Sequence, residues 1–283
     1  MVTAPWTKFP YDAKRYGYEG VALGAAWPEL HRGDCEPFPD AAFVKDAFQR
    51  HPRLKGSQDA AATAEALQSA WRAYHRGDFG AAVEQGVALG PIGANAANKA
   101  ANIYATYIES KSEAKREMLL ASAKRAEALQ AAAPDFPNAW YFHAQALGRY
   151  AQEISIVKAL AEGTGGKVKA SLDKALALAP NHAEAHVALG AYHAEVVSKV
   201  GGMLAKLTYG ATKEEAVRQF ALARKLIPDS AIARIEEANG LVLLFGKSKL
   251  AEAEALYKEA AKCTPADAMQ KLDAEHAREE AEG

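Results

Sequence analysis

The sequence predicts an all-α protein, a right-handed solenoid of about six irregular helical hairpins with a C-terminal capping helix. Helix-forming residues, above all alanine, leucine, glutamate and lysine, dominate the chain, and runs of β-branched residues are scarce. Small residues also return at a fixed spacing within helix-length segments. Each such segment ends at a proline, which cannot continue a helix. These prolines are Pro52, Pro91, Pro134, Pro180, Pro228 and Pro265.

The spacing of the small residues is clearest in the last two units. One unit carries Ala216, Phe220 and Ala223, and the next repeats the pattern with Ala253, Tyr257 and Ala260. Small residues allow two antiparallel helices to approach closely, and the aromatic ring fills the space between them. The pattern resembles the tetratricopeptide repeat (TPR). The prolines are spaced more widely than the roughly 34 residues of a minimal unit, so we expect longer helices or longer turns.

The expected order of segments follows from composition and from these breaks. The predicted parts are an irregular, proline- and aromatic-rich strap (1–15), two degenerate units (16–91), units with long helical inserts at 150–166 and 194–211 (92–265), and the capping helix (266–283). The charged outer face of that last helix would shield the final repeat from water.

Three local features carry further expectations. Residues 26–34 are echoed by residues 70–78, and in both copies we expect the Gly-Asp pair to end a helix, with the glycine left-handed. Thr212 and Glu215 have the spacing of a capping box at the start of a helix. The Gly201-Gly202 pair lies in an unusually apolar insert, which either folds back over the solenoid or forms a subunit interface.

Composition limits the class of partner. Lys and Arg total 34 against 35 Asp and Glu, which leaves a formal net charge of -1 and no basic excess for nucleic acid. No apolar run is long enough for a membrane span or a leader peptide. Cys35 and Cys263 lie near opposite ends of the array, so reduced thiols are expected. These features favour a cytoplasmic protein that binds a protein or peptide, without nucleic acid and without membrane insertion.

The first helices of such a solenoid line a concave groove, and seven polar positions are predicted to bind a partner there. Amide side chains can both donate to and accept from the backbone of an extended peptide, and Lys99 and Arg149 could receive a carboxylate. The alternative is a solvated face that has become polar without a ligand. The predicted binding residues are Asn95, Asn98, Lys99, Asn102, Tyr141, Gln145 and Arg149.

The sequence predicts neither a metal nor a cofactor nor catalysis. His186 and His193 are about 10 Å apart along a helix, too far for one tetrahedral ion, so these histidines and His182 are expected to pack. Residues 163–167 resemble half of a phosphate loop but lack its first glycine and the hydroxyl residue after the lysine. No nucleophile motif is present.

Residues from about 118 to 277 resemble the regulator of microtubule dynamics family, through the stretches 174–181, 207–216 and 240–247. A second, weaker resemblance is to TPR subunits associated with TRAP transporters. The TPR-like repeat favours a non-enzymatic scaffold that grips a peptide or partner protein in its groove. The second resemblance implies the alternative, an accessory subunit that binds a small ligand or forms oligomers. A homo-oligomer contact is expected at the apolar 194–211 insert. An open polar groove would favour the peptide, and an apolar cavity with few polar groups would favour the small ligand.

Overall fold

The structure is a computed structural model that describes residues 6–282, all of it helical or irregular, with no strand among these residues. Part of the predicted strap, residues 1–5, lies outside the described residues. The elements are η1 (Lys14–Tyr16), α1 (Ala22–Leu30), α2 (Ala41–Arg50), η2 (Pro52–Leu54), α3 (Ala60–Arg76), α4 (Phe79–Ala88), η3 (Gly90–Gly93), α5 (Ala94–Tyr107), α6 (Ser112–Ala132), α7 (Pro137–Gln152), α8 (Ile156–Ala161), α9 (Thr164–Leu178), α10 (Ala183–Val200), α11 (Gly202–Tyr209), α12 (Lys213–Leu226), α13 (Ala231–Phe245), η4 (Gly246–Lys249), α14 (Leu250–Ala260) and α15 (Ala268–Glu282).

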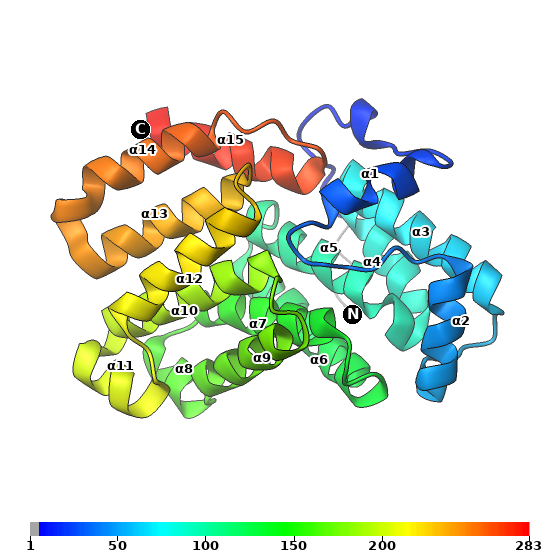
Figure 1. The fold of residues 1–283 in the computed structure, drawn as a ribbon, viewed down its shortest axis with the longest axis horizontal. Helices are drawn as coiled ribbons and strands as arrows, with labels where there is room; N and C mark the ends of the chain where they lie inside the picture. Colours follow the sequence, from blue (N-terminus) through cyan, green and yellow to red (C-terminus); the bar gives the residue numbers. More distant parts are fainter. Residues whose placement is uncertain (1–5, 283) are drawn as a thin grey trace.

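Consecutive helices pack in pairs, and the pairs stack along the chain (Figure 1). The pairs are α3 with α4, α5 with α6, α7 with α9, α10 with α12, and α13 with α14. The first helices α3, α5, α7, α10 and α13 follow one another along the inner face. The predicted all-α solenoid is therefore confirmed. Before the pairs, α2 packs on α3, while Trp27 of α1 contacts Trp71 of α3 edge-on.

Local sequence explains where helices begin and end. Asp59 and Ser230 each accept a backbone N–H at the start of a helix. Gly77 ends α3 with φ +88°, the left-handed conformation predicted for it. The same prediction is wrong for Gly33, which is not among the residues with positive φ. Gly33 is itself held by a distant helix, because its carbonyl accepts the backbone N–H of Glu184 of α10 at 3.0 Å.

One aromatic ring shows why the small residues recur. Phe220 of α12 is fully buried, and its ring lies against Gly190 of α10 and Gly240 of α13. A Cβ atom added at Gly190 would lie 2.7 Å from the ring, and one at Gly240 would lie 2.5 Å from it. The close helix approach predicted from residue spacing therefore occurs here, with the ring filling the space between three helices.

The C-terminal helix α15 does more than cover the last repeat. It packs on α13 and α14, and it also reaches α3 in the N-terminal half, beside α1 in Figure 1. The hydroxyl of Tyr74 contacts the sulfur of Met269 at 3.1 Å, and the Tyr18 hydroxyl donates to the carbonyl of Ala266. The two ends of the described chain therefore meet, and α15 closes one end of the concave face.

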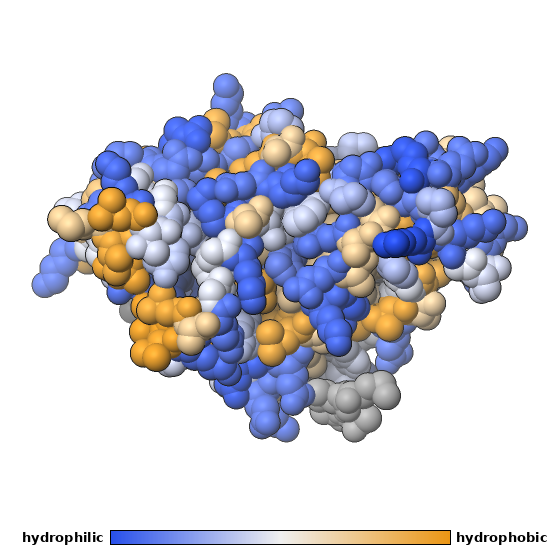
Figure 2. All heavy atoms as spheres, turned by 90° about the horizontal axis from the view of Figure 1, so that it is seen from below, coloured by the Kyte–Doolittle hydropathy of each residue, from blue (hydrophilic) through white to orange (hydrophobic). Residues whose placement is uncertain are grey.

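The two predicted inserts form the short helices α8 and α11. Gly201, at φ +81°, separates α10 from α11, so the glycine pair marks a bend. In α11 only Ala205 is buried, whereas Met203 and Leu207 are 81% and 79% exposed, and Val157 of α8 is also exposed. Figure 2 shows hydrophobic surface on this side of the molecule. The subunit contact predicted for the 194–211 insert stays a prediction, which the molar mass in solution would test.

None of the helices between residues 6 and 282 combines the length and the apolar character needed to cross a membrane.

Candidate functional site

A short segment of the chain itself lies across the inner face of the solenoid. This segment, Gly33-Asp34-Cys35-Glu36, is hereafter the 33–36 segment. The carbonyl of Gly33 accepts the backbone N–H of Glu184 from α10 at 3.0 Å, and the carbonyl of Asp34 accepts the amide of Asn138 from α7 at 2.9 Å. The first helices thus bind this segment through its backbone, as a groove would bind an extended peptide.

Two side chains that the sequence predicts to bind a partner are bonded instead to carboxylates of the 33–36 segment. Lys99 donates to Asp34 Oδ2 at 2.5 Å, and Asn95 donates to Glu36 Oε2 at 3.0 Å. Lys99 is only 1% exposed, and Asn95 is buried as well. The expected open face at these two positions is therefore absent from the described structure, because the chain's own segment covers it.

Asn98 and Asn102 are also buried, and each bonds to a neighbouring helix. Asn98 Oδ1 accepts from Arg125 of α6 at 2.9 Å, and Asn102 donates to Gln145 Oε1 of α7 at 2.9 Å. Asparagine is a poor helix former, and here one polar atom of each side chain makes a hydrogen bond to a neighbouring helix. The solvated polar face considered from sequence is not what the structure contains at these positions.

A buried chain of polar groups surrounds Asp34. His31 Nδ1 donates to Asp34 Oδ1 at 2.9 Å, and its Nε2 lies 3.2 Å from His75 Nε2. His75 Nδ1 donates in turn to Asp267 Oδ2 at 2.9 Å. Burial lowers the pKa of His31, and the neighbouring Asp34 carboxylate opposes this. Because both Nδ1 atoms face carboxylates, a hydrogen bond between the two Nε2 atoms forms only when one of them carries a proton.

At Lys99 and Asp34, the charged partners change the pKa more than burial does, and in the opposite direction. Burial by itself would lower the pKa of Lys99, but the carboxylates of Asp34 and Glu184 raise that pKa above its usual value. Burial would likewise raise the pKa of Asp34, but His31 and Lys99 hold it well below its ordinary range. Glu184 Oε1 lies 3.2 Å from Lys99 Nζ. Lys99 and Asp34 are consequently charged inside the protein, and each depends on its partners.

The three histidines of α10 and the turn before it bond within the chain. His182 Nδ1 accepts the N–H of Ala185 at 3.0 Å, and His186 contacts Gln219. His193 Nδ1 accepts the N–H of Thr212 at 3.2 Å. Thr212 caps α12 as predicted, but its own N–H goes to His193 instead of Glu215. Across residues 6–282, no group of three or more His, Cys, Asp or Glu side chains is placed to hold a metal ion.

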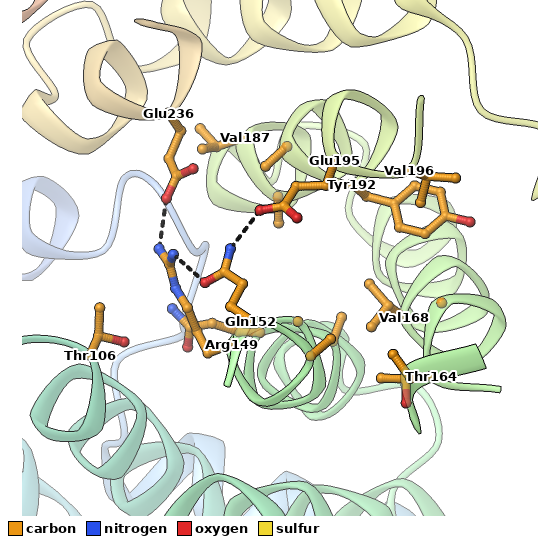
Figure 3. A pocket seen from close by; sticks show the side chains of 18 of the residues that line it. Thr106, Arg149, Gln152, Thr164, Val168, Val187, Tyr192, Glu195, Val196 and Glu236 are labelled. Carbon is orange, nitrogen blue, oxygen red and sulfur yellow. Dashed lines mark hydrogen bonds and ion pairs between the residues drawn. The ribbon is translucent and has the colours of Figure 1, made fainter. Parts of the chain in front are cut away.

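Beside the 33–36 segment, the concave face opens into a cavity of about 360 Å³ (Figure 3). Its outer end lies beneath the inserts and is mostly apolar, with Val168 of α9 and Tyr192 and Val196 of α10 facing it. Its inner end is formed by residues of α5, α7, α10, α13 and α15. The side chains at that end include Tyr107, Tyr141, Glu184, Val187, Ile232, Glu236 and Asp273.

A polar bridge crosses the cavity between these two ends (Figure 3). Arg149 donates to Glu236 Oε1 at 2.6 Å and to Gln152 Oε1 at 3.2 Å. Gln152 then donates to Glu195 Oε1 at 2.9 Å. The Glu236 carboxylate raises the pKa of the Arg149 guanidinium. The guanidinium expected to receive a partner's carboxylate therefore already has one, from α13.

Three of the seven predicted residues share this cavity, and four do not. Tyr141, Gln145 and Arg149 line it. Asn95, Asn98, Lys99 and Asn102 lie outside its lining, under the 33–36 segment or between helices. Sequence reasoning missed Asp34, Glu184, Glu236 and Asp273. A signal existed for Asp273, because it replaces an apolar residue in the stripe formed by Met269 and Ala277 at helical spacing.

Asp273 is a buried carboxyl group at the inner end of the cavity. Its side chain is 2% exposed, and Tyr107 donates to its Oδ1 at 2.5 Å. The pKa of Asp273 is raised to about 7, mainly by burial and also by the Asp267 and Glu184 carboxylates, while Tyr107 and Arg149 act in the opposite direction. No Lys, Arg or His of residues 6–282 forms an ion pair with it.

This raised pKa predicts a pH-dependent gain in stability for Asp273→Asn. In the unfolded chain the carboxyl ionises near 3.8, but in the fold it ionises near 7, so its ionisation opposes folding increasingly between those values. The variant should be more stable than wild type above about pH 7, and the difference should vanish below about pH 4. Urea unfolding at both pH values measures this. A difference that does not depend on pH would contradict the assignment.

Comparison with known proteins is limited to the fold. No family model matches the chain, and no curated protein matches it. Among solved structures, the chain is similar to the crystal structure of a thermophilic TPR protein from Thermus thermophilus, with a TM-score of 0.54 and 16% sequence identity. The match covers 76% of this chain and 97% of that one. The chain therefore has a TPR-like fold.

Proposed function

We propose that this protein is a non-enzymatic binding protein that takes a compact, largely apolar ligand into the cavity beside the 33–36 segment. The observation that supports this is the cavity itself, about 360 Å³ with mostly apolar walls and a few converging polar groups. That volume and that lining are typical of small-molecule sites. The 33–36 segment fills the adjoining part of the groove, where the backbone of a bound peptide would otherwise lie.

The proposal favours the small-ligand accessory subunit over the peptide scaffold, the two alternatives raised by sequence. Tyr141, Gln145 and Arg149 keep a place in the proposed site, because they line the cavity. Contact with a partner protein is proposed for exposed apolar residues outside the cavity lining, namely Val157 of α8 and Met203, Leu204 and Leu207 of α11. The cytoplasmic location stays a prediction.

Filling the cavity should abolish binding of an apolar probe. Ala191 of α10 lines the cavity, so Ala191→Trp places an indole ring in the ligand's space. With N-phenyl-1-naphthylamine, a neutral fluorescent probe, we expect saturable binding to wild type and at least about tenfold weaker binding to the variant. Fluorescence titration measures both affinities.

The matched control is Ala255→Trp on α14, which is exposed and outside the cavity. It adds the same ring without changing the site, so it should bind the probe as wild type does. Circular dichroism establishes that both variants are folded. Equal affinity of wild type and Ala191→Trp would refute binding in this cavity.

A further inference from the structure

We infer that the ligand carries a protonated amine, which Asp273 receives at the inner end of the cavity. This inference rests on the proposed function, since it names the chemical class of the molecule held there. It depends on three observations: the balance of charge at that end, the unused oxygen of Asp273, and the aromatic and apolar groups around it.

The inner end has more carboxylates than cations. Glu184, Glu236 and Asp273 all line it. The only cations close to them in the described chain are already paired, because Arg149 bonds to Glu236 and Lys99 bonds to both Asp34 and Glu184. Asp273 has no such partner among residues 6–282. A ligand with one positive charge would pair with Asp273, whereas a negatively charged ligand would be repelled by three nearby carboxylates.

Asp273 also keeps one oxygen free of hydrogen bonds. Tyr107 donates to Oδ1, and no residue of the described chain donates to Oδ2. Since the side chain is 2% exposed and lines the cavity, a molecule held in the cavity can reach this oxygen. A buried carboxylate with an unused acceptor is unfavourable unless a donor arrives. An ammonium group supplies three donors and the missing charge.

The surroundings of Asp273 favour an organic cation over a metal ion. The rings of Tyr107 and Tyr141 line the same end, and aromatic rings stabilise cations by their negatively charged faces. Val187, Ile232 and Met269 provide apolar walls beside them. A metal ion would need several oxygen or nitrogen ligands around one point, and no such group occurs within residues 6–282. The ligand class is therefore a primary amine with a compact apolar group.

Isothermal titration calorimetry with three matched probes tests this inference on the full chain. The probes are hexylamine hydrochloride, 1-hexanol and sodium hexanoate, which share a chain and differ in charge. At about pH 8, where Asp273 is ionised, hexylamine should bind at least about tenfold more tightly than hexanol, and hexanoate should not bind. Asp273→Asn should reduce the affinity for hexylamine by about tenfold or more and leave that for hexanol unchanged.

The control variant is Asp229→Asn, which makes the same chemical change at an exposed carboxylate paired with Arg32. It should leave the affinity for every probe as in wild type. If Asp273→Asn does not fold, the wild-type protein alone still tests the inference. The comparison of its affinities for hexylamine and hexanol needs no variant. Equal binding of these two probes, or an unchanged affinity for hexylamine in Asp273→Asn, overturns the inference.

Failure of the amine inference can be distinguished from failure of the proposed function. If N-phenyl-1-naphthylamine binds wild type but not Ala191→Trp, and hexylamine has no advantage, the cavity is a binding site and the amine is wrong. If neither the naphthylamine nor any hexyl probe binds, both proposals fail together.

Discussion

Replacing Lys99 with methionine should lower the free energy of unfolding by about 3–5 kcal/mol. Lys99 is buried and is the cation shared by Asp34 and Glu184, at 2.5 and 3.2 Å. Methionine fills similar space but carries no charge, so the Asp34 and Glu184 carboxylates would stay inside the protein without this cation. Urea unfolding followed by helical circular dichroism at neutral pH measures the loss.

Two variants show whether the effect arises from that pairing. Lys158→Met on α8 removes a lysine whose side chain is 52% exposed, and it should change stability by less than about 0.5 kcal/mol. Adding Asp34→Asn to Lys99→Met should recover part of the loss, because one stranded carboxylate is then neutral. If Lys99→Met cost less than about 1 kcal/mol, the buried ion pairs would not stabilise the fold as argued.

Phe220→Ala should cost about 3–5 kcal/mol, because it leaves a large cavity among α10, α12 and α13. The ring is 1% exposed and lies in contact with two glycines that have no side chain to move into the space. The same urea titration measures the change. Phe245→Ala, at the exposed end of α13, is the matched control and should cost much less.

A double-mutant cycle with Gly190→Ala tests the contact itself. In wild type the added methyl group would lie 2.7 Å from the Phe220 ring, so Gly190→Ala should destabilise the protein. In the Phe220→Ala background the ring is gone, and the methyl group has room. The two changes should therefore not be additive. Additive costs would mean that the ring and Gly190 do not pack against each other.

The fold was predictable because its signals are local. The spacing of Ala216, Phe220 and Ala223 lies within one helix, and the prolines that follow α6, α9 and α12 act on the residue directly before them. Gly77 is likewise left-handed because its own helix ends there. Such features need no knowledge of distant residues, so the sequence predicts the all-α solenoid and many of its helix ends.

The site was predictable only in part. Tyr141, Gln145 and Arg149, which their position along the first helices predicts to face the groove, line the cavity. Their role in binding a partner stays a prediction. The same rule predicts that Asn95 faces the groove with Lys99 beside it, but it could not show that the 33–36 segment covers both residues. An Arg-Gly-Asp sequence after a helix resembles an ordinary surface turn, and nothing local distinguishes Asp34 from Asp78.

Local sequence patterns specify the class of fold, the repeat spacing and the inner helices that line the cavity. Which charges are buried depends on contacts between distant parts of the chain, because a buried charge requires a partner and the partners here are far apart in sequence. Asp34 pairs with Lys99 across 65 residues, and His75 pairs with Asp267 across 192. The return of α15 to α3 likewise brings Asp273 to Tyr107, and that contact forms the inner end of the cavity.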